Sequence, residues 1–202
     1  YMLETSKEIK SEEILALPMM GDFIVPVLMA VLSMCTCLSC TTSSSISLEG
    51  KNFWIVKSLP IESIEIIKNK ILVNLAIIIP MLVINTIILA VSLKIMLIQY
   101  LLLLIITVLY AFLVSMIGMI VNLYLPKLEW KSHVEVVKQS ASAMISILAA
   151  AISVAIPIFL YTSLKPGNFN IFSMFVALGL LIVNIILWII IKTKGVKILN
   201  LL

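Results

Sequence analysis

Five long apolar stretches determine what this chain can fold into. Each is rich in Ile, Leu, Val, Met and Ala, and they cover residues 23–40, 71–93, 95–125, 140–161 and 169–191. About 20 apolar residues, at a rise of about 1.5 Å each, cross a hydrocarbon core of about 30 Å, so each stretch can span a membrane, the first only just. Within lipid a helix satisfies its own backbone hydrogen bonds, and we therefore predict five transmembrane helices.

The composition agrees with this interpretation. Hydrophobic residues make up 62% of the chain and charged residues 12%, whereas a soluble domain carries about 25% charged residues. Strands of a membrane barrel would be about 10 residues long with alternating polarity, and the sequence has no such pattern. We predict an all-α integral membrane protein in which residues 1–202 form a single transmembrane domain.

The lysines predict the orientation of the helices. All basic residues are lysines, 14 in total, and five spans place ten of them on one side and four on the other. Because cytoplasmic loops of membrane proteins are enriched in Lys and Arg, the richer side is predicted to be cytoplasmic. It contains a first loop, residues 41–70, a second loop, residues 126–139, and the C-terminus. The acidic N-terminal segment is predicted to lie outside.

Several kinds of chemistry are not indicated by the sequence. Cys35, Cys37 and Cys40 lie at the end of an apolar run, and the sole histidine, His133, is in another segment, so we predict small apolar packing residues and no metal site. No ionisable residue lies in the middle of an apolar run, as an ion-driven transporter usually requires. A Gly-rich phosphate loop is also missing. We expect no enzymatic activity, no cofactor and no nucleic-acid partner.

The fourth apolar run carries small residues on one helical face. These are Ser142, Ser146, Ala150 and Ser153. Small residues allow close approach of helix backbones, so this face is predicted to serve internal packing, a subunit interface or the lining of a pathway. In the third run, Leu103 is expected to face lipid.

The first polar loop contains an amphipathic segment, Leu48–Val56. Phe53, Trp54 and Val56 are predicted to form its apolar side, with charged residues opposite. Ser58 is predicted to cap the helix that follows. An element lying in the membrane interface between two spans could act as a lever or could be a passive surface helix.

The residues of both loops resemble a known family. The first loop reads S-L-E-G-K-N-F-W-I-V-K-S-L-P-I over Ser47–Ile61, and the second reads L-P-K-L-E-W over Leu125–Trp130, followed by V-V-K-Q-S over Val136–Ser140. Together they resemble the cytoplasmic loops of permeases from bacterial type-2 ATP-binding-cassette (ABC) exporters. That family has units of six helices, so the five here are expected to be helices two to six, with one helix preceding Tyr1.

The resemblance implies a permease subunit in the bacterial cell membrane, working with a second transmembrane unit of the same or a homologous chain. A coupling helix, about Glu49–Lys57, would dock on a separate ATP-binding-cassette ATPase. The expected contact residues are Glu49, Lys51, Phe53, Trp54 and Lys57, with a weaker contact through Lys127, Glu129 and Trp130. The lack of charged residues inside the apolar runs favours a hydrophobic or amphiphilic substrate, and the resemblance implies that it moves outward across the membrane, where lipid surrounds the permease.

Two other functions remain compatible with the residues. The chain could be a non-transporting scaffold or sensor subunit that uses the same loop to bind a partner. It could also belong to a secondary transporter whose ion-coupling groups lie further upstream.

The predicted orientation can be tested by cysteine labelling. In a background that lacks the three native cysteines, single cysteines at Ser132 and Lys194 should react only from the cytoplasm, and those at Ser11 and Asn168 should react from outside. If an impermeant reagent labelled Ser132→Cys in intact cells, the predicted orientation would be wrong.

Overall fold

The computed structural model describes residues 18–58, 60–130, 136, 140–164 and 166–201. The acidic N-terminal segment, His133 and most of the second loop after Trp130 lie outside these residues. Every regular element in the described part is a helix, which confirms the prediction of an all-α integral membrane protein.

The apolar stretches correspond to five long helices. Their bounds are α2 Pro18–Leu38, α4 Ser63–Ser92, α5 Leu97–Tyr124, α7 Ala141–Leu164 and α8 Phe169–Ile190. A π-helical turn, η2 Ile191–Gly195, continues α8 into α9 Val196–Leu201. In the described residues α4, α5, α7 and the continuous Phe169–Leu201 helix are long and apolar enough to cross a membrane, and the apolar part of α2, Ile24–Leu38, is shorter.

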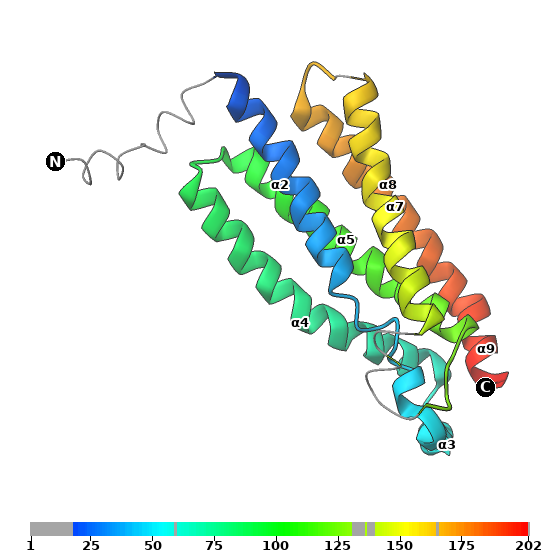
Figure 1. The fold of residues 1–202 in the computed structure, drawn as a ribbon. Coiled ribbons are helices and arrows are strands. Elements are labelled where there is room, and N and C mark those ends of the chain that lie inside the picture. The colour runs from blue at the N-terminus through cyan, green and yellow to red at the C-terminus, as the bar shows by residue number, and fades with distance from the viewer. Residues whose placement is uncertain (1–17, 59, 131–135, 137–139, 165, 202) are drawn as a thin grey trace.

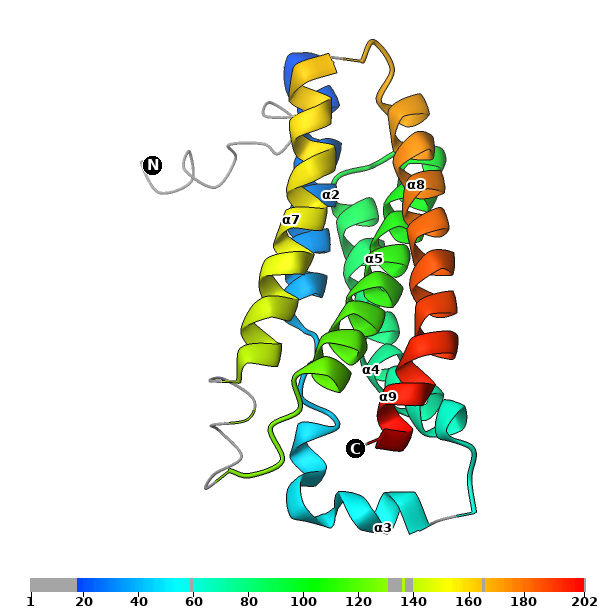
Figure 2. The same ribbon diagram turned by 90° about the vertical axis from the view of Figure 1, so that its right-hand side faces the viewer.

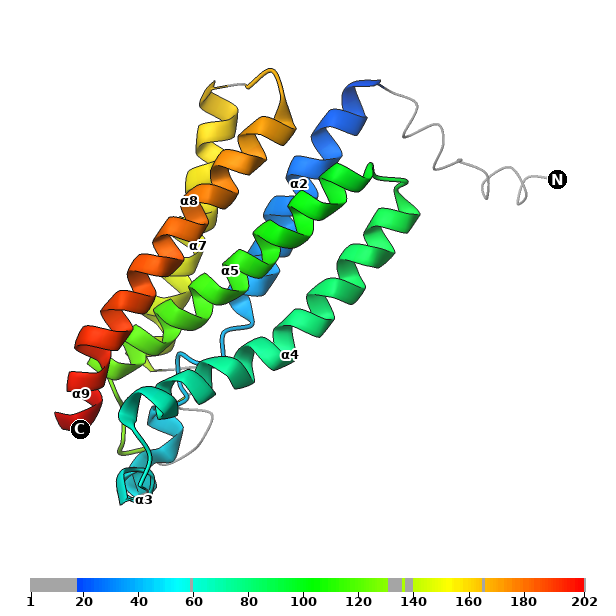
Figure 3. The same cartoon turned by 180° about the vertical axis from the view of Figure 1, so that it is seen from behind.

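Helix α5 is the centre of the bundle. It contacts α2, α4, α7 and α8, and Figures 1 and 3 show it passing between the others. The α4–α5 turn and the α7–α8 loop lie at one end, while the short helix α3 Phe53–Ser58 and α9 lie at the other (Figure 2). The first polar loop and the lysines of the C-terminal tail therefore share one end, as the five-span topology requires.

The buried face of α5 corrects one expectation. Leu103 is fully buried, not lipid-facing, whereas Leu101 is 46% exposed. The run is apolar on all sides, so hydrophobic periodicity does not reveal which face meets other helices.

A second correction concerns the start of α4. Ser58 ends α3, and α4 begins at Ser63 with Glu62 at the N-cap, because Pro60 and the residues around it form a separate bend between the two helices.

The small-residue face of α7 lies inside the bundle. Ser142, Ser146 and Ala150 are each at most 1% exposed, and α7 packs against α2 and α5. The Cys37 thiol of α2 donates to the Ala150 carbonyl over 3.7 Å, and Ser153 is half-buried. These contacts support internal packing as the role of the face.

This packing predicts different effects of two leucine substitutions on α7. Ser146 is 1% exposed on a helix that packs against α2 and α5, so the volume added by Ser146→Leu has little room and should destabilise the protein by about 1–3 kcal/mol. Ile147 is 40% exposed, so Ile147→Leu should change little. Thermal unfolding of both purified variants measures the difference, and equal midpoints would show that Ser146 does not sit in a tight contact.

Candidate partner-docking surface

The segment after α2 is not helical, yet it is buried. Thr42, Ser43, Ser44 and Ile46 are each at most 5% exposed. Buried backbone amides need hydrogen-bond partners, and no regular element supplies them here. Turn hydrogen bonds take up the N–H groups of Ser44 and Ser45, which donate to the carbonyls of Thr41 and Thr42 at 3.4 and 3.3 Å. Side chains of α4 and α5 supply acceptors for others.

Two asparagines hold this segment. Asn74 of α4 accepts hydrogen bonds at Oδ1 from the backbone N–H and the hydroxyl of Thr41, over 3.1 and 2.7 Å. Asn122 of α5 accepts at Oδ1 from the N–H groups of Ile46 and Ser47, over 2.8 and 3.2 Å. Both asparagines are fully buried. Their amides fix the position at which the chain leaves the bundle.

Ser47 is the junction of the two polar loops. Its hydroxyl accepts from Asn122 Nδ2 at 2.8 Å and from the backbone N–H of Lys127 at 2.9 Å. Its carbonyl accepts from the indole N–H of Trp130 at 2.8 Å. The other hydrogen bond of Asn122 Nδ2 goes to Ser142 of α7 at 3.2 Å. One residue therefore links the first loop, the second loop and, through Asn122, two spanning helices.

Gly50 is required at this junction for two reasons. Its φ is +53°, a conformation that L side chains rarely adopt. A Cβ on Gly50 would also lie 2.9 Å from Trp130 Nε1 and 3.3 Å from the Leu128 carbonyl oxygen. The backbone of the first loop is thus in direct contact with the second.

The element η1 Ser47–Asn52 then leads into α3, which runs across the end of the bundle (Figure 2). Glu49 is paired with Lys70 of α4, with Oε1 and Nζ 2.7 Å apart, and Lys70 also donates to the Ser45 carbonyl. Lys57 Nζ donates to the carbonyl of Asn200 in α9 at 3.2 Å. Charged residues at both ends of the segment therefore bind the bundle.

The aromatic pair in this segment is divided between two environments. Phe53 is 4% exposed and belongs to a cluster with residues of α4, α5 and α9, whereas Trp54 is 66% exposed. Successive residues of a helix point about 100° apart, so the two rings need not share one face. The expected common apolar side of Phe53, Trp54 and Val56 is therefore wrong. Phe53 anchors α3, and Trp54 is presented outward.

The outward side of this region forms an open hollow of about 510 Å³. It lies between η1, α3 and the start of the second loop, and Lys51, Trp54, Lys57 and Glu129 line it. All four are exposed, while Lys127 and Trp130 are half-buried behind them. Of the expected contact residues, these four line the hollow together with Phe53. Contacts inside the chain are made by Glu49, Phe53, Lys57, Lys127 and Trp130.

The importance of Asn122 and of Ser47 as a junction was not evident from the sequence. The available signal was an amide side chain near the end of an apolar run, placed just before the second loop.

In the described residues no group of three or more His, Cys, Asp or Glu side chains could hold a metal ion. The arrangement offers binding through aromatic and charged side chains.

Comparison with known proteins gives one match. The model of a family described as "Membrane protein of 12 TMs" matches residues 13–194. No curated protein and no solved structure matches.

The junction predicts a large effect of Asn122→Ala. The substitution leaves the buried N–H groups of Ile46 and Ser47 without their acceptor, so it should lower the free energy of unfolding by about 2 kcal/mol or more. It should also free the first loop, and trypsin should cut at Lys51 and Lys57 faster. Asn85→Ala is the matched control, because Asn85 is exposed on α4. Equal stability and equal cleavage of the two variants would contradict the role given to Asn122.

Proposed function

The chain belongs to the family described as membrane proteins of 12 TMs, and from this premise we propose that it is the permease subunit of an ATP-driven exporter of the ABC type. In this proposal the chain hydrolyses no ATP itself. A separate ATPase subunit docks on η1 and α3, and a hydrophobic or amphiphilic substrate moves outward across the cell membrane.

The observation that carries the proposal is the exposure of Trp54 on a segment that is otherwise firmly held. Trp is among the residues that contribute most to protein interfaces, and charged neighbours set the register of a partner. Trp54 is flanked by the exposed Lys51 and Lys57. A tryptophan that served only to bury α3 in its own bundle would lie where Phe53 lies.

The way α3 is attached suits the transmission of force. Its base is joined to α4 through Glu49 and Lys70 and to α5 through Ser47 and Asn122. Phe53 packs into the same cluster as Ile67 and Ile71 of α4. A displacement of α3 by a docked partner would therefore act on α4 through the partly buried ion pair and the packing of Phe53, and on α5 through the buried bond of Ser47 to Asn122.

The second loop takes part in the same surface. Glu129 lines the hollow beside Trp54, and the indole of Trp130 fixes the loop to Ser47. A partner that binds at α3 would thus meet residues of both loops. This supports one composite docking surface in place of a strong and a weak contact that are independent.

Substitution of Trp54 tests the proposal. Trp54→Ala should leave the thermal unfolding midpoint unchanged, because the side chain is mostly exposed. It should weaken ATPase docking by about 2 kcal/mol, or about thirtyfold, and ATP hydrolysis by the complex should fall. The measurement is quantitative co-purification of an ATP-binding-cassette ATPase from native membranes, with hydrolysis measured on the purified complex.

Two further variants separate docking from folding. Leu101→Ala is the lipid-facing control and should change neither quantity. Phe53→Ala removes a buried ring and should lower stability by about 3–5 kcal/mol. If Trp54→Ala retains the ATPase as well as the wild type does, the docking surface is wrong. If the wild type retains no ATPase at all, a scaffold or secondary-transport role is favoured.

A further inference from the structure

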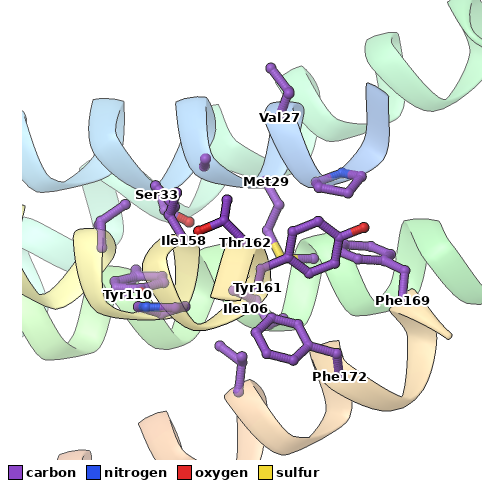
Figure 4. A pocket seen from close by; sticks show the side chains of 15 residues that line it. Val27, Met29, Ser33, Ile106, Tyr110, Ile158, Tyr161, Thr162, Phe169 and Phe172 are labelled. Atoms are coloured by element: carbon purple, nitrogen blue, oxygen red, sulfur yellow. The ribbon is translucent and has the colours of Figure 1, made fainter. Parts of the chain in front are cut away.

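A cavity lies at the end of the bundle away from α3. It has a volume of about 130 Å³, is partly open, and is lined by residues of α2, α5, α7 and α8 (Figure 4). The residues that line it extend along α2 from Pro26 to Ser33, which corresponds to a depth of about 10 Å. Nearly all of them are apolar or aromatic. The cavity is far from the loop junction and takes no part in the docking surface.

Prolines of two helices contribute to the cavity. Pro26 of α2 and Pro157 of α7 both line it, and a proline inside a helix removes one backbone hydrogen bond. Pro157 cannot donate to the carbonyl of Ser153, four residues earlier. The hydroxyl of Tyr110, which also lines the cavity, donates to that carbonyl at 3.0 Å. The hydrogen of the tyrosine hydroxyl is thus committed to the backbone, and its oxygen can only accept a hydrogen bond from a ligand.

Ser33 is different. It lines the cavity, is 1% exposed, and its hydroxyl oxygen has no hydrogen-bond partner. Thr36 and Ser39, further along the same chain segment, donate to the carbonyls four residues before them. Buried hydroxyls normally have hydrogen-bond partners, so an unpartnered hydroxyl in the wall of an apolar cavity indicates that a ligand supplies the partner.

Aromatic rings form another part of the wall. The ring centroid of Tyr161 lies 5.7 Å from that of Phe169 and 5.4 Å from that of Phe172, in edge-on and tilted arrangements. Figure 4 shows the three rings grouped beside Met29. Such arrangements are those that aromatic rings prefer with one another, and a further ring could join the group.

We propose that this cavity binds an aromatic ring that carries one hydrogen-bonding group, as a phenol does. A cavity of about 150 Å³ with an apolar lining accommodates benzene, so the volume fits a single ring. The ring packs against the aromatic wall, and its polar group forms a hydrogen bond with the Ser33 hydroxyl. A lipid acyl chain would fill the space but would leave the Ser33 hydroxyl without a partner. The proposal does not depend on the docking of an ATPase.

Binding can be measured by fluorine NMR on the full-length protein in lipid nanodiscs. Para-fluorophenol should give a saturable bound signal, and fluorobenzene should bind more weakly. Ser33→Ala should weaken para-fluorophenol by about fivefold, the loss expected for one hydrogen bond, and should leave fluorobenzene unchanged. The matched control is Ser173→Ala, because Ser173 is also buried with an unpartnered hydroxyl but does not line the cavity.

A cavity-filling variant provides a second test. Ala30→Phe, at a lining residue, should abolish binding of both probes, whereas Ala155→Phe, at an exposed position of α7, should not. If Ala30→Phe fails to fold, the selectivity of Ser33→Ala decides alone. The proposal is overturned if para-fluorophenol shows no saturable binding or if Ser33→Ala affects both probes equally. It is also overturned if binding occurs in detergent but not in nanodiscs, since acyl chains would then occupy the cavity.

Discussion

The structure depends on how the chain leaves α2 without exposing buried backbone groups. A helix in lipid satisfies its own amides, but α2 ends at Leu38 and the non-helical residues that follow include the buried Thr42, Ser43, Ser44 and Ile46. Asn74 and Asn122 supply acceptors for the backbone that follows. Their side chains come from α4 and α5, so the exit of α2 and the packing of these two helices are determined together.

The hydrogen bonds of Asn122 and Ser47 also join the two polar loops to each other and to the bundle. Ser47 is bonded to Asn122, to the Lys127 backbone and to Trp130, and Gly50 has no space for a side chain against Trp130. The two loops consequently behave as one unit attached to α4, α5 and α7. Among the described residues, the exposed side chains of Lys51, Trp54, Lys57 and Glu129 project from it around one hollow.

The two ends of the bundle differ in chemistry. The end with α3 carries lysines and a network of amides and hydroxyls, whereas the other end contains a partly open apolar cavity with an unpartnered hydroxyl, that of Ser33, in its wall. Prolines in α2 and α7 line that cavity, and Tyr110 takes up the carbonyl that Pro157 cannot bond. Helix α5 reaches both ends, with Asn122 near one and Ile106 near the other, and it connects the docking surface with the cavity.

The sequence by itself determined the class of the protein, the positions of its long helices and the shared end of its polar loops. These follow from the length of apolar runs, because a bilayer sets the number of residues that a span needs. It did not determine which faces meet. Leu103 and Leu101 are equally apolar in the sequence, and only the position of α5 at the centre of the bundle buries one and exposes the other. Likewise, Phe53 and Trp54 look alike as neighbours in the loop, and their separation arises from the angle at which α3 crosses the bundle. Asn122 has its role because three distant segments converge on it, and such convergence is a property of tertiary structure that no local pattern encodes.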